Sequence, residues 1–376
     1  MVDQGRWKGV SKWKLETPCL VVDQDRLEQN IRTMQSHVAS FGKKLRPHAK
    51  THKCSRIAKM QVEAGAVGIC VAKVSEAEVL ARSGVKGTLV TSPVVTDLKI
   101  SRLMECLSLD PEMMVVVDNP ANARRLSEES TRRGLRLNVL VDLDPGMGRT
   151  GVSFEDGLAL GRSLSSLPGL HLRGVQCYAG HVQHIPAFKD RVATSLGWME
   201  QAANVVRQFR EKGLPCDIFT GSGTGTCEID GRIPELTDLQ TGSYTMMDAE
   251  YVGIGSLENP SQFEKFPPAL TLLTSVVNTN HADHVTVDAG LKALYHDGAT
   301  PYVLNPASPV LRYEWRGDEH GQINFSAGSV RFELGHVLEL VVSHCDPTVN
   351  LFDVLYMTRN NVVTDLWPVD MRGKCL

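Results

Sequence analysis

Residues 46–53 read Arg46-Pro47-His48-Ala49-Lys50-Thr51-His52-Lys53. Segment 45–50 is a strand candidate, and Lys50 is the residue at which that strand would stop. His48 and His52 stand two positions to either side of this lysine. Other strand segments along the chain also stop in polar, chemically capable loops. Their number and spacing indicate the fold.

Strand segments alternate with helical patterns from residue 17 to residue 251. After segment 45–50, further strand candidates follow at 68–73, 88–92, 113–119, 135–144, 170–178, 216–221 and 236–244. Helical patterns separate most of them, although the connection between the last two is short and loop-like. Eight successive strands with crossovers predict an α/β fold, a parallel (β/α)8 TIM barrel. In such a barrel the chemistry lies at the C-terminal ends of the strands.

Two of the helices have clear sequence signals. Apolar residues recur at helical spacing after the strand candidate at 17–23, namely at Leu27, Ile31, Met34 and Val38. We expect this helix to end at Gly42. Ser75 and Glu78 have the S-x-x-E spacing of a capping box, which predicts a helix beginning there.

The texture of the sequence changes after about residue 259. Short β-branched segments separated by Gly, Pro and Asp occur at 285–288, 330–334, 336–342 and 354–358. They predict a second, β-rich domain, and the spare strand at 17–23 could join its sheet. We therefore expect a barrel domain at 24–258 and a β-rich domain made of residues 1–23 and 259–376.

The composition argues against several classes of partner. The 376 residues are 42% hydrophobic, which is ample for a core, and carry a net charge of −3 with a pI near 6.5. No dense basic run suggests nucleic acid, and no apolar stretch approaches the roughly 20 residues of a membrane span. Residues 1–15 lack the apolar region of a secretory signal, and nine cysteines without a C-x-x-C pair are typical of reduced thiols. We expect a cytoplasmic protein.

Lys50 is a candidate nucleophile. Burial at a barrel mouth would lower the pKa of its amine and make it reactive toward a carbonyl group. The alternative is a solvated lysine at the end of a strand. Lys73, which ends the second barrel strand, fits that plainer interpretation better.

Residues 220–226, after the seventh barrel strand, alternate serine or threonine with glycine. Such a run presents backbone N–H groups and hydroxyls without bulky side chains, which suits a phosphate group. Gly242, Ser243 and Tyr244 end the eighth strand and add further donors. Phosphate sites in barrels are often built from the loops after strands seven and eight. A flexible turn of similar composition is the alternative.

Two more loops carry candidate site residues. In 144–151, after the fifth strand, glycines surround Arg149, which could meet an anionic oxygen. The loop after the sixth strand offers the aromatic ring of Tyr178 and the imidazoles of His181 and His184. One of the two histidines could act as a base near neutral pH. A solvated arginine and structural histidines are the alternatives.

His344 and Asp346 lie in the predicted β-rich domain. In an extended stretch their side chains would point to the same side and Cys345 to the other. An imidazole with a carboxylate, and without a thiolate, can hold Mn²⁺, Mg²⁺ or Ca²⁺. Taken alone, two neighbouring polar residues are more often simply polar surface.

These motifs together resemble those of the D-threonine aldolases, within the alanine racemase-like (fold type III) family of pyridoxal-phosphate enzymes. The resemblance extends from Thr17 to Trp367. Its most specific parts are Arg46-Pro47-His48-Ala49-Lys50, Gly148-Arg149-x-Gly151, Gly180-x-x-Gln183-His184, Gly223-Thr224-Gly225, Gly242-Ser243-Tyr244 and His344-x-Asp346-Pro347-Thr348. It implies a (β/α)8 barrel with a C-terminal β domain, paired as a homodimer.

The resemblance implies a role for each motif. Lys50 would hold pyridoxal 5'-phosphate covalently, Arg149 would meet the phenolic oxygen of the cofactor ring, and Tyr178 would lie against the cofactor. His344 and Asp346 would bind Mn²⁺ or Mg²⁺, with His184 nearby. The phosphate would be held by Gly223, Thr224, Gly225, Gly242, Ser243 and Tyr244.

The implied activity is a metal-activated retro-aldol cleavage of D-threonine and related D-3-hydroxy-amino acids to glycine and an aldehyde. His184 would remove the proton of the β-hydroxyl, and the cofactor ring would accept the electrons of the broken Cα–Cβ bond. The alternative is a D-serine or 3-hydroxy-D-aspartate dehydratase, which eliminates water and ammonia. Those dehydratases typically carry His-x-Cys where this chain has His344 and Asp346, and a carboxylate suits Mg²⁺ or Mn²⁺ better than Zn²⁺. A non-catalytic carrier of pyridoxal phosphate would have the barrel alone.

The sequence leaves some features open. The aldehyde half of the small-molecule substrate is not readable, because no cation can be assigned to a distal carboxylate. Arg312 and Arg316 lie in the predicted β-rich domain, but the direction of their side chains is unknown. Four other polar residues could line the site or only solvate its edge: Lys73, Lys292, Glu319 and His320.

Overall fold

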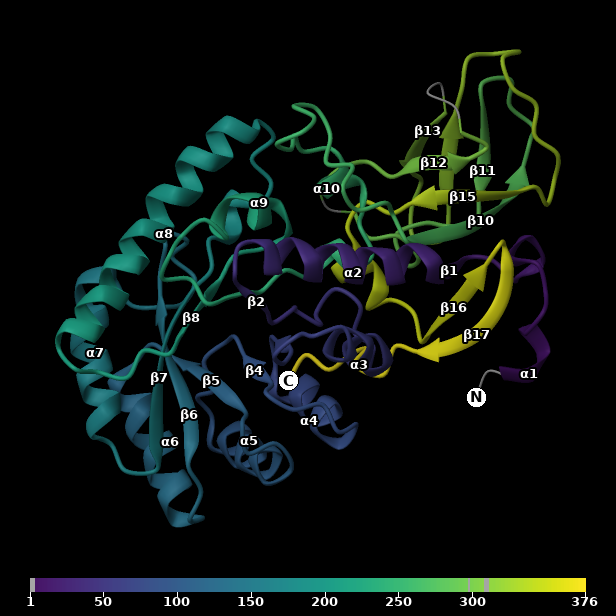
Figure 1. The fold of residues 1–376 in the computed structure, drawn as a ribbon. Coiled ribbons are helices and arrows are strands. Elements are labelled where there is room, and N and C mark those ends of the chain that lie inside the picture. Colours follow the sequence, from purple (N-terminus) through teal and green to yellow (C-terminus); the bar gives the residue numbers. More distant parts are fainter. Residues whose placement is uncertain (1–3, 297, 308–310) are drawn as a thin grey trace.

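The computed structural model describes residues 4–296, 298–307 and 311–376. Its strands form two sheets, one of eight strands and one of nine (Figure 1). The first three residues of the predicted segment 1–23 lie outside the described residues. A single apolar core cluster contains buried residues of both sheets, for example Val141 in one and Leu272 and Leu340 in the other.

The eight-stranded sheet is a parallel barrel. Its strands are β2 (Lys44–Leu45), β3 (Cys70–Val71), β4 (Leu89–Val90), β5 (Met114–Val117), β6 (Leu137–Leu143), β7 (Leu170–Cys177), β8 (Ile218–Gly221) and β9 (Asp238–Leu239). Seven of them lie inside segments that the sequence predicts, whereas β2 only overlaps the predicted segment 45–50: it ends at Leu45, and Lys50 lies in the turn that follows. The order runs β2-β9-β8-β7-β6-β5-β4-β3. A parallel bridge between His48 and Cys70, with Ala49 N–H donating to Cys70 O over 2.8 Å, connects the two ends and closes the barrel.

Helices cover the outside of the barrel (Figure 1). The longer ones are α2 (Gln24–Ser40), α3 (Ser55–Glu63), α4 (Val74–Arg82), α5 (Asp97–Leu109), α6 (Pro120–Arg132), α7 (Phe154–Ser166) and α8 (Phe188–Glu211). In α2 the predicted apolar stripe is buried, and Gly42 follows the helix with a φ of 68°. That positive φ favours glycine and ends the helix where the sequence predicts.

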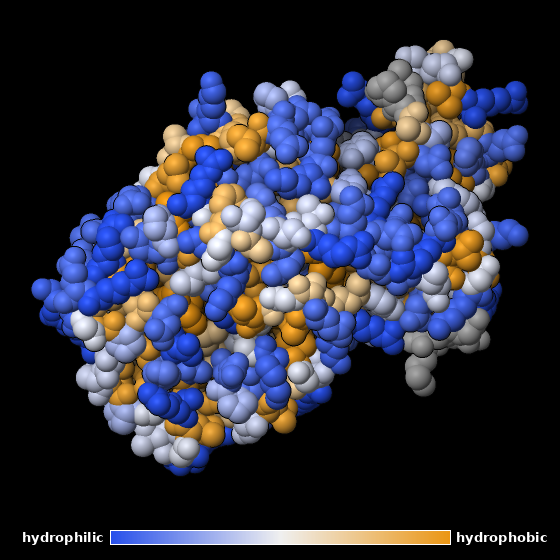
Figure 2. Space-filling model, viewed as in Figure 1, coloured by the Kyte–Doolittle hydropathy of each residue, from blue (hydrophilic) through white to orange (hydrophobic). Residues whose placement is uncertain are grey.

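Short helical turns fill several loops. They are α1 (Gln4–Trp7), α9 (Cys227–Asp230), α10 (Ala249–Val252), α11 (Cys345–Val349), η1 (Lys12–Lys14), η2 (Gly180–Val182), η3 (Thr224–Thr226) and η4 (Ser243–Thr245). The connection between β8 and β9 is short, as the sequence indicates, but contains η3 and α9. No helix of the described residues is both long enough and apolar enough to cross a membrane. In the view of Figure 2, hydrophilic residues cover most of the surface and apolar residues are scattered among them.

The nine-stranded sheet is mixed. It contains β1 (Cys19–Asp23), β10 (Leu270–Asn278), β11 (His284–Val287), β12 (Tyr302–Asn305), β13 (Arg312–Trp315), β14 (Gly321–Asn324), β15 (Val337–Val341), β16 (Val354–Arg359) and β17 (Val362–Pro368). As the sequence suggests, β1 joins this sheet, antiparallel to β10 and parallel to β16. The domain limits at residues 23/24 and 258/259 remain a prediction, although the strands on either side belong to different sheets.

The predicted strand at 330–334 is wrong. These residues form an irregular segment ending in a turn, and most of their side chains are exposed. Phe332 is buried against the rings of Phe325 and His336. Of this segment only Phe332 is buried in the core, and β14 and β15 pair with β11, β13, β10 and β12 instead.

The predicted capping box is displaced by two residues. Helix α4 begins at Val74, and the carboxylate of Glu76 accepts the N–H groups of Ala72 and Lys73 over 2.9 and 3.1 Å. The other oxygen of Glu76 accepts from Lys53 Nζ over 2.6 Å in a buried ion pair. Glu78 pairs instead with Arg102. Glu76 therefore fixes the loop that follows Lys50 to the start of α4.

Replacing Glu76 and Glu78 separately by alanine tests this assignment. Glu76→Ala leaves the buried Lys53 ammonium and two N–H groups without an acceptor, and we expect it to lower the unfolding free energy by about 3–5 kcal/mol. Glu78→Ala removes a partly exposed pair and should cost about 1 kcal/mol or less. Urea denaturation followed by circular dichroism measures both. Equal costs would contradict the displaced cap.

Candidate active site

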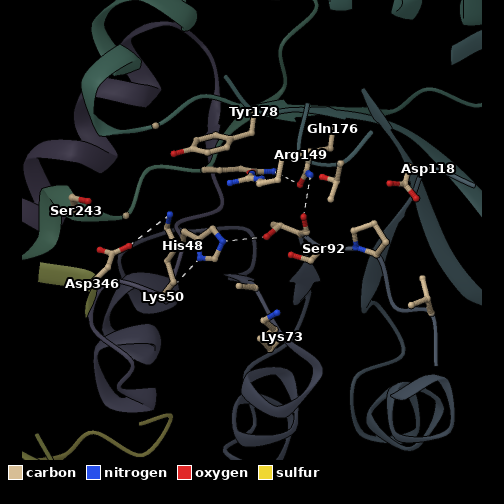
Figure 3. Close-up of a pocket in the computed structure, with 18 of the residues that line it drawn as sticks. His48, Lys50, Lys73, Ser92, Asp118, Arg149, Gln176, Tyr178, Ser243 and Asp346 are labelled. Atoms are coloured by element: carbon tan, nitrogen blue, oxygen red, sulfur yellow. Dashed lines mark hydrogen bonds and ion pairs between the residues drawn. The ribbon is translucent and has the colours of Figure 1, made fainter. Parts of the chain in front are cut away.

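A cavity of about 830 Å³ opens at the C-terminal ends of the barrel strands and reaches the β-rich sheet. It brings together most of the residues that the sequence singles out (Figure 3). Those that line it are His48, Lys50, Lys73, Arg149, Tyr178, His184, Gly223, Thr224, Gly242, Ser243, His344 and Asp346. Gly225 and Tyr244 are not among its lining residues.

Lys50 points into this cavity. Its Nζ lies 3.6 Å from Asp346 Oδ2, and the side chain is 41% exposed. The sequence interpretation expected burial to lower the pKa of this amine, and that expectation is wrong. The Tyr178 phenol and the Asp346 carboxylate raise the pKa of Lys50 above its ordinary value, against the effect of desolvation. The carboxylate stands in α11, almost 300 residues further along the chain, so the residues around Lys50 carry no sign of it.

The two histidines beside Lys50 are buried and have structural contacts. His48 Nδ1 accepts the backbone N–H of Lys50 over 3.2 Å, and its Nε2 lies 3.1 Å from Thr91 Oγ1. Burial and the neighbouring Lys50 charge hold the pKa of His48 well below its usual value, so the ring is neutral. His52 faces Gln61, and burial lowers its pKa to about 4. Both rings hold the shape of the loop that presents Lys50.

The two predicted phosphate loops face one another at one end of the cavity. A Cβ on Gly223 would lie 2.4 Å from Gln183 Oε1, and one on Gly242 would lie 2.8 Å from Thr51 Oγ1, so neither position accepts a side chain. Four N–H groups have no acceptor among the described residues: those of Thr224, Gly225, Gly242 and Ser243. A cradle of free N–H donors at glycines fits a phosphate group.

Tyr244 contributes to this cradle indirectly. Its side chain is fully buried, its hydroxyl accepts from Gln61 Nε2 over 2.9 Å, and its N–H donates to Thr224 Oγ1 over 3.1 Å. It therefore orients Thr224 from behind and offers no free donor of its own.

Arg149 and Lys50 lie on the same aromatic ring. The Arg149 guanidinium carbon is 5.7 Å from the centroid of Tyr178, and Lys50 Nζ is 5.8 Å from it. Such cation–π contacts hold both positive charges close to the phenol ring. An aromatic cofactor beside this ring would therefore find cations at its polar edge.

The structure places the side chains of His184 and His181 in different surroundings. His184 lines the cavity, its Nδ1 is 2.9 Å from Glu250 Oε1, and its Nε2 is buried without a hydrogen-bond partner among the described residues. His181 packs against Trp198 of α8, away from the cavity. The hydrogen bond to Glu250 keeps the proton on Nδ1 and leaves the lone pair of Nε2 free.

His344 and Asp346 line the cavity together, although the stretch containing them is not extended. His344 is the N-cap of α11 and Asp346 stands in its first turn, while Cys345 is buried and points to Met247 O. Although burial opposes a charge on either group, the Asp248 hydrogen bond and the Asp346 charge raise the pKa of His344 to about 9. Lys50 and His344 lower the pKa of Asp346.

The donor set fits a divalent ion that keeps open positions. Asp346 Oδ1 is buried without a hydrogen-bond partner among the described residues, and the His184 and His344 rings lie 6.3 Å apart. In the part of the chain that the structure describes, no three His, Cys, Asp or Glu side chains form a group that could hold a metal. His344 and Asp346 would thus supply two ligands, and water or substrate the rest.

Asp248 and Glu250 are residues that sequence reasoning missed. Asp248 Oδ2 accepts His344 Nδ1 over 3.0 Å and the N–H of Cys345 over 2.9 Å, and its Oδ1 caps α10 by accepting from Tyr251 N–H. Glu250 lies between His184 and His344, with Oε2 3.4 Å from His344 Nδ1. A weak signal was present, because an Asp-x-Glu pair lies in the chain segment between the last barrel strand and the β-rich sheet.

The residues left open by the sequence divide into two groups. Lys73 lines the cavity, where the sequence favoured a solvated strand end. Lys292 and Glu319 form an exposed ion pair with each other, and Arg316 pairs with Glu314. Arg312 lines a separate groove beside β12 and β13. Neither these four residues nor His320 line the active-site cavity.

Replacing Asp248 tests whether its hydrogen bonds hold the His344–Cys345 segment against the start of α10. Asp248→Ala leaves three donors without an acceptor in a site with 0% side-chain exposure, and we expect a loss of about 3 kcal/mol in unfolding free energy. Asp353→Ala removes an exposed partner of Arg372 and should change stability by less than about 0.5 kcal/mol. Thermal or urea unfolding distinguishes the two. A cost for Asp248→Ala as small as that of the control would show that these hydrogen bonds do not hold the His344–Cys345 segment in place.

Comparison with known proteins points to one family. Residues 22–249 match the family model described as alanine racemase, N-terminal domain, and residues 269–358 match a putative serine dehydratase domain. The chain is 38% identical to a D-threonine aldolase of an Arthrobacter species, over 96% of this chain and 93% of that protein. It is 35% identical to a 3-hydroxy-D-aspartate aldolase of Paracoccus denitrificans, over 97% and 94%.

A solved structure agrees with this assignment along the whole chain. The crystal structure of D-threonine aldolase from Filomicrobium marinum superposes with a TM-score of 0.91 at 34% identity and covers 98% of both chains. The fold of nearly the whole chain therefore has a counterpart in one solved structure. The chain belongs to the alanine racemase-like family of pyridoxal-phosphate enzymes, in the group that includes these D-threonine and 3-hydroxy-D-aspartate aldolases.

Proposed function

We propose that this protein is a metal-activated, pyridoxal-phosphate-dependent lyase that cleaves D-threonine and related D-3-hydroxy-amino acids to glycine and an aldehyde. One observation carries the proposal: the Lys50 amine lies between a phosphate cradle and, 3.6 Å away, the carboxylate of the His344–Asp346 pair. A covalent cofactor and a divalent ion would thus meet the same substrate. The names of the similar aldolases support this choice.

The chain's own residues divide the binding work. Lys50 would hold the cofactor through its amine, with Arg149 at the phenolic oxygen and Tyr178 beside the ring. The backbone donors around Gly223 and Gly242 would hold the phosphate. Pyridoxal phosphate bound there supplies an electron sink for the carbanion at Cα.

The metal end of the cavity would handle the β-hydroxyl. His344 and Asp346 would hold a divalent ion, and the chemistry that the ion would supply is a lower pKa of that hydroxyl. His184 Nε2, whose lone pair is kept free because Nδ1 is bonded to Glu250, would take the hydroxyl proton. The Cα–Cβ bond then breaks, its electron pair stays with Cα, and a proton added to Cα completes glycine. The side of the cofactor on which His184 and Asp346 lie would select the D-configuration.

The assembly and the compartment are part of the same proposal. The family resemblance implies a homodimer, and the charge and cysteine pattern favours the cytoplasm. Sedimentation of the purified protein measures whether it is a dimer. The barrel at 24–258 would carry the cofactor, and the domain of 1–23 and 259–376 would carry the metal ligands.

A substrate panel tests the reaction itself. With D-threonine we expect glycine and acetaldehyde, formed with added Mn²⁺ or Mg²⁺ and lost after chelation. D-Serine and 3-hydroxy-D-aspartate belong in the panel, because the match to a serine dehydratase domain keeps elimination as a second possible reaction. Release of ammonia and a keto acid as the main products would reject the aldolase assignment.

Two substitutions distinguish the role of Lys50 in binding the cofactor from the role of Asp346 in binding the metal. Lys50→Ala should abolish both the visible absorbance of the bound cofactor and turnover. Asp346→Ala should keep the absorbance while turnover falls to the level of the chelated wild-type protein. Asp283→Ala, at an exposed surface position, is the control and should change neither. If Asp346→Ala remains fully active in the presence of chelator, the metal role is wrong.

Glu250 is expected to position His184. Glu250→Ala removes the acceptor of His184 Nδ1–H, and we expect kcat to fall roughly 10–100-fold with a smaller change in KM. Glu250→Gln keeps an oxygen acceptor and should recover part of the loss. Steady-state kinetics at saturating metal measure all three proteins. An effect on KM alone would mean that Glu250 serves substrate binding instead.

A further inference from the structure

Arg191 is a buried cation without a carboxylate partner. It lies in α8, is 1% exposed, and all of its side-chain hydrogen bonds go to backbone carbonyls. Nε donates to Gly225 O over 2.7 Å, while Nη1 and Nη2 donate to Ile185 O and Gly255 O. No carboxylate among the described residues forms an ion pair with it; the charge of Glu228 reaches it, but that carboxylate is paired with Lys265 over 2.7 Å.

Other buried cations in this protein do have such partners. Lys12 pairs with Glu339 over 2.7 Å, Lys53 pairs with Glu76, and Arg46 pairs with Asp238 over 3.3 Å. A buried charge is costly unless an opposite charge or a bound ion compensates it. Carbonyl dipoles solvate the Arg191 guanidinium but leave its positive charge in place. An anion near Arg191 would complete the arrangement.

The phosphate cradle lies on the other side of the same loop. Gly225 gives its carbonyl to Arg191, and its own N–H is one of the four free donors of the cradle. Thr224 and Ser243, the polar side chains of the cradle that line the cavity, are uncharged. A phosphate dianion held there would be separated from the Arg191 guanidinium by little more than one residue of backbone.

We propose that Arg191 is the counter-charge of the bound phosphate group and acts through the Gly225 loop without touching the ligand. The ligand class is a phosphomonoester dianion. The inference rests on the proposed cofactor site and adds a positioning residue to it. Since the same guanidinium holds the carbonyl of Ile185, directly after His184, it also connects the phosphate loop with the loop of the proposed base.

Comparing the affinity for pyridoxal phosphate with the affinity for pyridoxal tests whether Arg191 compensates the charge of the phosphate group. The apoprotein is titrated with each, and binding is followed by absorbance. Arg191→Gln should weaken pyridoxal phosphate roughly tenfold or more, whereas pyridoxal, which lacks the phosphate, should bind as it does to the wild type. Inorganic phosphate should likewise compete less well for the variant. Arg210→Gln, the same change at an exposed position of α8, is the control and should alter neither affinity.

A second pair of variants keeps Arg191 and its hydrogen bonds. The ring of Phe188 lies 5.4 Å from the guanidinium, so Phe188→Glu would bring a carboxylate beside it, and Phe188→Gln is the neutral match. We expect Phe188→Glu to bind pyridoxal phosphate more weakly than Phe188→Gln, with no difference for pyridoxal. This pair decides the matter if Arg191→Gln does not fold.

The outcomes that would overturn the inference are distinct. Equal losses for pyridoxal and pyridoxal phosphate in Arg191→Gln would mean that Arg191 only supports the backbone. Unchanged phosphate selectivity in both pairs of variants would remove the counter-charge role altogether, while leaving the cofactor proposal intact. Failure of the wild-type apoprotein to bind pyridoxal phosphate would reject the proposed function itself, before any variant is measured.

Discussion

The contact between Lys50 and Asp346 is the constraint on which the site depends. It joins the end of the first barrel strand to the first turn of α11, which follows a strand of the other sheet. The continuous apolar core that runs through both sheets holds the two groups at 3.6 Å. The proposed chemistry therefore depends on the contact between the barrel and the α11 segment and not on the barrel alone.

A small polar network holds the His344–Cys345 segment against the start of α10. Asp248 receives three donors, two of them from the His344–Cys345 segment, and Glu250 lies between the two imidazoles that face the cavity. Both carboxylates flank the start of α10, in the segment between the last barrel strand and the β-rich sheet. Buried polar groups that are fully paired hold a single geometry, because breaking any one bond leaves an unsatisfied partner. The imidazole orientations at the proposed metal end follow from this pairing.

The charges around the cavity are distributed unevenly. Lys50 and Arg149 lie against Tyr178, the carboxylates gather around His344, and the phosphate cradle carries only neutral donors. Arg191 lies behind the cradle, outside the cavity. A ligand with a phosphate at one end and a metal-binding hydroxyl at the other matches this order. The cationic, anionic and neutral regions of the cavity can thus orient a small substrate without a large apolar contact surface.

The sequence by itself determined the elements and the chemical inventory. Eight strand segments, the α2 stripe and the polar loops were readable because burial periodicity and glycine positions are local properties. It also identified Lys50, Arg149, His184 and the His344–Asp346 pair. The tertiary structure decided which groups meet: Glu76 caps α4 in place of Glu78, His184 faces the cavity while His181 does not, and Asp346 raises the pKa of Lys50. Those outcomes depend on contacts between distant segments, and spacing along a chain does not encode which distant side chain will be opposite.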